Sequence, residues 1–226
     1  MILYGSSFSP YVRKTLAFAA EKGIELDSRP IRLRDADPEF RQASPFGKMP
    51  AFRHPGAGED GGDFLLSDST AIIAYLDALK PEPVLIPAEP KARATAFWWE
   101  EFADTILAPA GAKIFFNRIV APLFLQREGD EQAAAKAEAE ELPPLLDHLE
   151  AALGEDGHMV GGRLTLADLA VASPFANLRH LGIGIDAKAR PKLAAFVAAM
   201  LARPSFFFWI EKEERFLAKT APQQGR

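Results

Sequence analysis

LYGSSFSPYVRKTLAFAAEKG, residues Leu3 to Gly23, is the stretch that decides the fold. A short apolar strand ending at Tyr4 leads through small polar residues into Ser9-Pro10, and a helical pattern then continues to Gly23. Serine before proline is a strong helix-start signal, because serine caps the first N–H groups and proline is pre-shaped for the first helical position. Glycine suits the left-handed position that ends a helix. The sequence therefore predicts strand, tight turn and helix, with the Ser9 hydroxyl at a helix N-terminus, where an anion binds favourably.

The composition is that of an ordinary globular protein with one large or two small domains. Of the 226 residues, 48% are apolar and 25% charged, and the net charge of −5 gives no support for a nucleic-acid partner. The longest apolar stretch runs from Leu193 to Ala202, well short of the ~20 residues that span a membrane. Met1 leads directly into a strand rather than into a signal peptide. We expect a cytoplasmic protein with no membrane partner.

Cysteine is absent, which excludes disulfides, thiolate zinc sites and a cysteine nucleophile. The four histidines stand at no metal-ligand spacing, so we interpret them as surface or hydrogen-bonded residues and expect no metal. Residues 56–61 formally match G-x-G-x-x-G, but a strand rather than a helix follows them, and Glu59 and Asp60 would repel phosphate. This segment is predicted to be a long hairpin loop. No G-x-S-x-G motif or local histidine base supports Ser9 as a nucleophile, so Ser9 is predicted to act as a hydrogen-bond donor.

The first part of the chain alternates between strands and helices. Strands are predicted after the opening helix at Glu25 to Leu33, Met49 to Arg53 and Phe64 to Ser67. Asp37-Pro38 opens a short helix and Asp68-Ser69 caps a longer one. The pattern predicts a small α/β sandwich of four strands and three helices over residues 1–79. The apolar face of the last helix is expected to hold Ile72, Ile73, Tyr75, Leu76 and Leu79.

Proline-punctuated residues 80–90 are predicted to be a linker, and residues 91–226 an all-helical domain. Pro109 is expected to kink or divide the first long helix of that domain. Thr165 and Asp168 stand as N-cap and third helical residue, which predicts a capping pair with a folding role. The predicted helices are residues 91–126, 130–153, 165–181, 190–201 and 205–217.

Four segments, in this order along nearly the whole chain, resemble a cytosolic glutathione transferase, specifically a bacterial member of the serine-type classes. Ile2 to Gly5 with Ser9-Pro10-Tyr11 resembles the opening of the tau, phi and zeta-like classes. Ser44 to Pro50 resembles N-P-x-x-x-V-P, and Asp68 to Leu76 resembles E/Q-S-x-A-I-x-x-Y-L, although aspartate replaces the more usual glutamate or glutamine. Gly161 to Asp168 resembles G-x-x-x-T/S-x-A-D. The resemblance implies a thioredoxin-like α/β N-terminal domain, an all-α C-terminal domain and a homodimer.

The resemblance also implies where glutathione, the co-substrate, binds. Lys48 matches a position that often holds its glycine carboxylate, and the Met49 backbone pairs with its cysteinyl unit beside a cis Pro50. Asp68 and Ser69 correspond to the residues that bind the γ-glutamyl end. Asp68 suits the ammonium and Ser69, at a helix N-terminus, suits the carboxylate.

The resemblance makes Ser9 the residue that stabilises the glutathione thiolate. A thiol of pKa near ~8.5 is only a few per cent ionised at pH 7, and lowering that pKa by about two units requires about 2.7 kcal/mol. A charge-assisted hydrogen bond and a helix N-terminus together have that magnitude. Tyr11, on the same helical turn, is a second catalytic candidate. Tyr4 is instead predicted to be a core residue. Arg13, near the helix start, is predicted to be a solvated charge, with local attraction of an anion as the alternative.

The implied reaction is attack of the thiolate on a small hydrophobic electrophile, as in detoxification, with the electrophile bound between the domains. A glutathione-dependent isomerase of the maleylacetoacetate type is an alternative, although the zeta-type opening S-S-C-S matches this chain only at its first serine. A transferase-fold binding or regulatory protein is the non-enzyme alternative. The candidate electrophile-lining residues, most of them expected to be core, are Phe8, Tyr11, Trp98, Asp104, Phe115, Phe116 and the run Phe206-Phe207-Phe208-Trp209.

Overall fold

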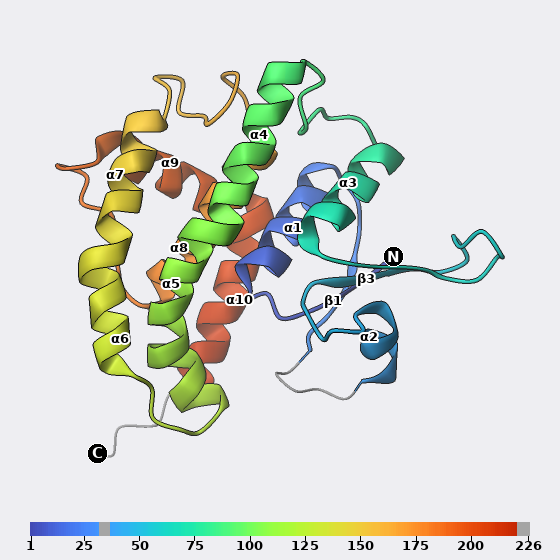
Figure 1. Ribbon diagram of the computed structural model, residues 1–226, viewed down its shortest axis with the longest axis horizontal. Helices are drawn as coiled ribbons and strands as arrows, with labels where there is room; N and C mark the ends of the chain where they lie inside the picture. The colour runs from blue at the N-terminus through green and yellow to red at the C-terminus, as the bar shows by residue number, and fades with distance from the viewer. Residues whose placement is uncertain (32–36, 221–226) are drawn as a thin grey trace. The chain divides into compact units, whose positions relative to one another are not determined.

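A computed structural model describes residues 1–31 and 37–220 of the chain (Figure 1). The chain divides into two compact units, Met1–Ile86 and Pro87–Arg226. The division falls inside residues 80–90, the predicted linker.

The first unit is the predicted α/β domain built around one mixed four-stranded sheet. The strand order is β2-β1-β3-β4, with β1 parallel to β2 and antiparallel to β3, and β3 antiparallel to β4. The loop at residues 55–63 joins β3 to β4, so the G-x-G-x-x-G segment is a hairpin loop as predicted. The elements are β1 (Ile2–Tyr4), α1 (Pro10–Glu21), β2 (Asp27–Arg29), α2 (Pro38–Ala43), β3 (Ala51–His54), β4 (Phe64–Ser67) and α3 (Ser69–Leu79).

Helices cover both faces of this sheet, as expected for a strand such as β1 whose successive residues are all apolar and point to opposite faces. Helices α1 and α3 pack against each other, and Figure 1 shows them on the opposite side of the sheet from α2. Phe52 meets the Tyr75 ring of α3 at 5.7 Å between centroids. Successive residues of a strand point to opposite faces, so Ala51 and its partner Tyr4 lie on the face opposite Phe52. There they form a core with Phe40 of α2.

Several predictions about these elements are wrong in detail. The second strand is Asp27–Arg29, so it begins two residues after Glu25 and ends before Pro30, and residues 32 and 33 of the predicted strand lie outside the described part of the chain. The third strand begins at Ala51 rather than Met49, after the cis Met49–Pro50 bond, because proline lacks a ladder donor. Arg13 is fully buried rather than solvated, and Leu79, at the end of α3, is 48% exposed.

The second unit is helical throughout its described residues, as predicted. Its central helix is α8, whose residues Leu166 to Leu178 are all buried, and which packs against α4, α5, α9 and α10. A helix buried on every side needs apolar or small residues all round, as this one has. The elements are α4 (Pro90–Phe102), η1 (Ala103–Leu107), α5 (Ala108–Phe115), η2 (Phe116–Phe124), α6 (Glu131–Lys136), η3 (Ala137–Glu141), α7 (Leu142–Ala152), α8 (Leu166–His180), α9 (Pro191–Leu201) and α10 (Pro204–Thr220), where η marks a π-helical segment.

Pro109 changes the hydrogen-bond register of the long helix rather than dividing it. The chain remains one helix from Pro90 to Phe124, but residues 103–107, just before the proline, are π-helical. A proline has no N–H and crowds the carbonyl four residues earlier, and a π-helical turn accommodates both effects without a break. Pro122 lies within a second π-helical segment of the same helix.

The predicted capping pair at the start of α8 is confirmed. The Asp168 carboxylate accepts hydrogen bonds from the Thr165 N–H at 2.7 Å and the Thr165 hydroxyl at 3.0 Å. It also accepts one from the Met159 N–H at 2.8 Å, so one buried carboxylate holds both the helix start and the preceding loop.

Length and composition alone would allow the helix Pro90–Phe124 to cross a membrane, although it contains no uninterrupted apolar stretch of that length. The α4 segment of this helix packs against α8, and the core helix of a soluble protein passes the same test.

Candidate functional site

The predicted site segments meet at one edge of the sheet. Tyr4, Ala51 and Ser67 lie in one row across β1, β3 and β4. The segment from Gly5 to Ser9 follows Tyr4 and the Asp68-Ser69 pair follows Ser67, whereas Met49 and Pro50 precede Ala51 on an antiparallel strand. Antiparallel pairing therefore brings three segments that are distant in sequence to the same end of the sheet.

Close backbone approaches hold these segments together. Gly5 has a φ of +149°, and a Cβ placed on it would lie 2.6 Å from Val12 Cγ2 and 3.4 Å from Met49 Cβ. Only glycine lets the first turn of α1 and the Met49 segment approach β1 so closely. On the other side, the Asp68 N–H donates to the Pro50 carbonyl at 3.3 Å. The sequence did not point to this role of Gly5, although a glycine directly after a strand was the available signal.

Ser9 lies at the N-cap of α1 but does not cap it. Its backbone is extended, its N–H donates to the Ser6 carbonyl at 2.9 Å, and its carbonyl accepts the first helical bond from the Arg13 N–H at 2.9 Å. Its side chain makes no capping hydrogen bond, so the predicted cap is wrong. The other two helices of this unit are capped, by Asp37 and by Asp68. The Ser9 hydroxyl is therefore not committed to the first-turn N–H groups of its own helix.

The loop that leads to Met49 is closed by a side chain that the sequence analysis overlooked. Ser44 is 1% exposed, and its hydroxyl donates to the Lys48 carbonyl at 2.7 Å. Within this loop the Gly47 N–H donates to the Ser44 carbonyl at 2.9 Å. The Lys48–Met49 peptide is planar and trans, so its N–H points opposite to its carbonyl. The Met49 N–H is thereby directed away from Ser44, and Met49–Pro50 is the cis bond that the resemblance implied.

Asp68 combines two unusual properties at the start of α3. Its φ of 84° is positive, which is uncommon outside glycine and costs on the order of 1 kcal/mol or more. Its Oδ1 accepts hydrogen bonds from the N–H groups of Thr70 at 2.9 Å and Ala71 at 3.4 Å. The following Ser69 is 3% exposed. Strained residues of this kind are concentrated at ligand sites.

Tyr4 is a core residue, as predicted. It is fully buried, and its hydroxyl donates to Glu39 Oε2 at 2.9 Å. Burial, and secondly this hydrogen bond, raise the pKa of the Tyr4 phenol above its usual value, so the group is un-ionised at neutral pH. Glu39 also accepts from Arg29 at 2.8 Å, which joins α2 to the sheet. Tyr11, the other tyrosine considered, is half-buried in the first turn of α1.

The histidines make structural contacts. His54 Nδ1 lies 2.9 Å from the Tyr75 hydroxyl, and the buried His180 Nε2 lies 2.7 Å from Glu213 Oε2. In the described part of the chain, no three His, Asp or Glu side chains are grouped so that they could hold a metal ion.

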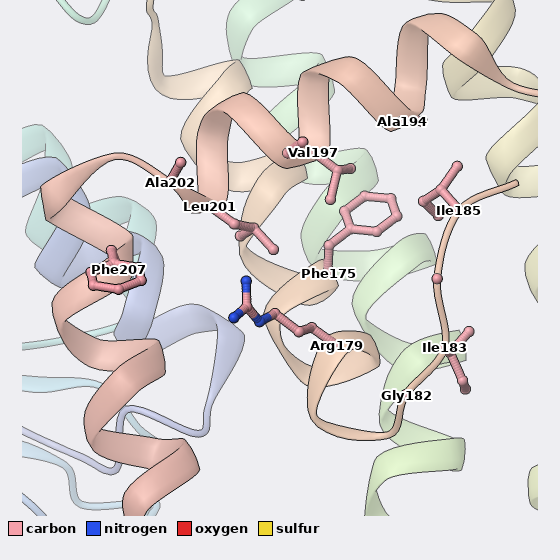
Figure 2. Close-up of a pocket in the computed structure, with 12 residues that line it drawn as sticks. Phe175, Arg179, Gly182, Ile183, Ile185, Ala194, Val197, Leu201, Ala202 and Phe207 are labelled. Atoms are coloured by element: carbon pink, nitrogen blue, oxygen red, sulfur yellow. The ribbon is translucent and has the colours of Figure 1, made fainter. Parts of the chain in front are cut away.

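The helical unit has a pocket of its own, of about 510 Å³ (Figure 2). It lies among α8, the turn at residues 182–185, α9 and the start of α10, and Phe175 and Val197 line it together with the Arg179 guanidinium. Phe207 belongs both to this lining and to the predicted electrophile-lining set. Only Phe115 and Phe206 of that set are buried, so the expectation that most of the set belongs to the core is wrong, and Trp98 and Phe208 are 52% and 56% exposed.

Comparison with known protein families gives matches in both parts of the chain. A family model described as “Glutathione S-transferase, N-terminal domain” matches residues 3–84, and one described as “Glutathione S-transferase, C-terminal domain” matches residues 112–204. All the residues of the sheet edge described above fall within the first match.

Individual proteins match over nearly the full length. Glutathione S-transferase 4 of Zea mays is 30% identical over 215 residues, covering 90% of this chain and 88% of that protein. Maleylacetoacetate isomerase of Pseudomonas aeruginosa is 30% identical over 203 residues, covering 90% and 91%. A solved structure of a glutathione S-transferase from Methylobacterium radiotolerans, in complex with glutathione sulfonate, has a TM-score of 0.72 and 26% identity, covering 92% of this chain and 93% of that one.

Proposed function

The chain belongs to the glutathione S-transferase family, and we propose that it is a serine-type glutathione transferase in which Ser9 activates the glutathione thiol. The observation that carries the proposal is the meeting of three segments at one edge of the sheet. Three groups occur together there: the Ser9 hydroxyl, which caps no N–H group of its own helix, the Met49 N–H, which points away from Ser44, and the strained N-cap Asp68.

Ser9 is the proposed catalytic residue because of the chemistry that its position offers. Its hydroxyl donates a hydrogen bond to the thiolate sulfur, and the N-terminus of α1 adds a favourable electrostatic field. Together these stabilise the anion by about 2.7 kcal/mol, which lowers the thiol pKa by about two units. No proton acceptor is needed on the protein, since the thiol proton is released to solvent. Tyr11, on the same turn, is the second candidate donor.

The remaining residues hold glutathione along the sheet edge. The Met49 N–H, directed away from Ser44, donates to the carbonyl of the cysteinyl unit, and Pro50 shapes the turn there. Lys48 binds the glycine carboxylate. At the other end of the ligand, Ser69 and the N-terminus of α3 bind the γ-glutamyl carboxylate, and Asp68 binds its ammonium. Glutathione bound at these positions places its sulfur near Ser9.

The reaction is attack of the bound thiolate on an electrophilic carbon of a small hydrophobic substrate. The sulfur–carbon bond forms as the leaving group departs. With an activated double bond, it forms as the π electrons of that bond shift onto the activating group, and the adduct then takes a proton from solvent. Stabilisation of the anion and positioning of the two reactants are sufficient for this chemistry, because neither step requires a covalent enzyme intermediate. The helical domain, proposed as residues 91–226, contributes the electrophile pocket.

Ser9→Ala tests the central assignment. We expect wild-type protein to bind glutathione by calorimetry and to show the thiolate ultraviolet band near neutral pH. Ser9→Ala should still bind glutathione but lose the band. Survival of the band in Ser9→Ala, together with its loss in Tyr11→Phe, would transfer the role to Tyr11. Absence of glutathione binding to the wild type would overturn the transferase assignment.

A glutathione-dependent isomerase is the second candidate, favoured by the similarity to the Pseudomonas aeruginosa maleylacetoacetate isomerase. In an isomerase the thiolate adds to a double bond and then leaves, so glutathione is regenerated, whereas a transferase consumes it. Free thiol measured during turnover separates the two: a constant thiol concentration while substrate isomerises supports the isomerase. Neither outcome fits a purely regulatory protein, which would show no turnover.

We propose that the protein acts in the cytoplasm as a homodimer. Phe46, in the loop before Lys48, is 90% exposed, and burying its aromatic ring against a partner subunit would remove apolar area from water. Light scattering should give twice the 24.7 kDa mass of one chain. A single-chain mass at micromolar concentration would contradict the dimer.

A further inference from the structure

Helix α9 and its C-cap contain the longest apolar stretch of the chain, Leu193 to Ala202, which the proposed function leaves unexplained. One face of the helix belongs to the core, because Leu193, Phe196 and Met200 are buried. A second face, with the i, i+3, i+4, i+7, i+8 spacing of a helical stripe, lines the pocket of the helical unit. Its members are Ala194, Val197, Ala198, Leu201 and Ala202. Both Ala198 and Ala202 are exposed, so α9 has apolar surface that the core does not cover.

Larger apolar side chains from neighbouring segments form the other walls of this pocket. Phe175 comes from α8, Ile185 from the turn that follows it and Phe207 from α10. Figure 2 shows the Phe175 ring and the Ile185 side chain pointing toward Val197. A Cβ built on Gly184 would meet no atom within 4 Å, so the turn leaves open space at this lining residue. The volume of about 510 Å³ falls within the roughly 300–1,000 Å³ of pockets that bind small organic molecules, which are mostly apolar with a few polar groups.

Arg179 is the one charged residue among those that line the pocket. Its Nε donates to Glu214 Oε1 at 2.9 Å, which orients the guanidinium. A guanidinium has five N–H donors, and in the part of the chain that the structure describes, those on Nη1 and Nη2 have no carboxylate or carbonyl acceptor. Figure 2 shows the guanidinium on the side of the pocket where Leu201 lies. The pocket therefore combines apolar walls with one oriented set of cationic donors.

We propose that this pocket binds a small apolar carboxylate. Its hydrocarbon body packs on Phe175, Val197 and Ile185, and its two oxygens accept hydrogen bonds from the Nη groups of Arg179. A carboxylate is the anion favoured here, because the planar pair of guanidinium N–H groups matches its two oxygens. The site uses none of the residues assigned to glutathione, so it goes beyond the proposed function and does not depend on it.

The first test uses two probes with the same hydrocarbon chain, decanoate and the uncharged 1-decanol, below the concentration at which decanoate forms micelles. Calorimetry on the full chain should show decanoate binding to wild type. Arg179→Gln should weaken decanoate about threefold to fivefold, a modest factor because the arginine side chain is 47% exposed, and should change 1-decanol by less than about twofold. Glu214→Gln should strengthen decanoate by a similar factor, because it removes a competing negative charge while keeping an acceptor for Nε. Equal weakening of both probes by Arg179→Gln would overturn the assignment of the carboxylate to Arg179.

A matched pair of substitutions on α9 tests the location. Ala198 lines the pocket and Ala199 does not, and both are exposed, so a larger side chain at either position does not overpack the core. Ala198→Trp fills the pocket and should weaken both probes by about tenfold or more, whereas Ala199→Trp should bind them as wild type does. Equal binding of decanoate by the two variants would place the probe elsewhere and overturn the inference.

S-hexylglutathione separates this pocket from the proposed transferase site, because its two parts occupy the glutathione and electrophile positions. Saturation with S-hexylglutathione should leave the affinity for decanoate unchanged within about twofold, as expected for independent sites. Loss of decanoate binding under these conditions would show that the probe occupies the electrophile position, and would overturn the inference. Absence of decanoate binding to wild type would also overturn it, while binding of glutathione would still support the proposed function.

Discussion

Asp68 performs two separable tasks that a pair of substitutions can distinguish. Its backbone has a positive φ, and its Oδ1 caps α3, so a residue here must tolerate the left-handed region and supply a short acceptor. Asparagine satisfies both requirements without the negative charge, and alanine satisfies neither. The proposed contact with the ligand ammonium, by contrast, depends on the charge.

Asp68→Asn is therefore expected to keep the free energy of unfolding within about 0.5 kcal/mol of wild type. Asp68→Ala should lose about 1–2 kcal/mol, because the cap is removed while the backbone strain persists. Both variants should bind glutathione several-fold more weakly. Urea unfolding and calorimetry measure the two effects. Full affinity in Asp68→Asn would show that the charge does not contact the ligand.

Tyr4→Phe tests whether the buried tyrosine has any part in activation. Burial and the hydrogen bond to Glu39 raise the pKa of Tyr4, so the phenol neither ionises nor turns toward the ligand at neutral pH. The thiolate band should be unchanged, and the free energy of unfolding should fall by about 1 kcal/mol because Glu39 loses a donor. A band lost in Tyr4→Phe but retained in Ser9→Ala would make Tyr4 the activating residue.

Among the helices and strands, the features predicted correctly are those decided within a few residues. The caps at Asp37, Asp68 and Thr165, and with them the starts of α2, α3 and α8, depend on side chains that reach only two or three positions along the chain. The Ser9 cap was predicted by the same rule and is wrong, because no local signal decides whether a serine hydroxyl turns toward its own helix or away from it. The π-helical register before Pro109 is also not encoded in the apolar spacing.

The parts of the site that could not be predicted depend on contacts across the sheet. Ser69 and Met49 were assigned to the candidate site because their segments resemble motifs of the family. The closeness of Gly5 to Met49, and of Asp68 to Pro50, appears only when the strands are paired. The hydrogen bond by which the Ser44 hydroxyl closes its five-residue loop was not predicted. In the sequence, such a serine looks the same as any other loop serine.

The start of α8 offers a prediction about stability and pH. Asp168 accepts three hydrogen bonds while fully buried, and burial raises its pKa even though those bonds oppose the shift. Asp168→Ala should lower the free energy of unfolding by about 2–4 kcal/mol, because the cap is lost and buried N–H groups are left without an acceptor.

The pH dependence of that loss follows from the direction of the shift. An acid whose pKa is higher in the folded state binds its proton more tightly when folded, so its contribution to stability falls as pH rises from its unfolded pKa through its folded pKa. The advantage of wild type over Asp168→Ala should therefore be larger near pH 4 than at pH 7, as measured by urea unfolding. An advantage that grows with pH would mean that the hydrogen bonds outweigh burial and lower the pKa.

For the whole molecule, the central question is which of the two units contains the glutathione site, because each offers a candidate. The sheet edge of Met1–Ile86 carries the proposed ligand contacts, whereas the pocket of about 510 Å³ lies in Pro87–Arg226. A ligand stabilises the structure that it binds, by about 2.7 kcal/mol at a concentration one hundred times its dissociation constant. Local opening of the backbone is suppressed most where the ligand makes its contacts.

Hydrogen exchange with and without saturating glutathione should therefore show its largest added protection at residues 5–12, 47–51 and 68–72. These segments contain the first turn of α1, the Met49 loop and the start of α3. Ser9→Ala should show the same pattern, since it removes thiolate stabilisation and leaves the other contacts in place, whereas Asp68→Asn should lose protection mainly at residues 68–72. Added protection confined to residues 175–207 would place glutathione in the helical pocket and contradict the sheet-edge site.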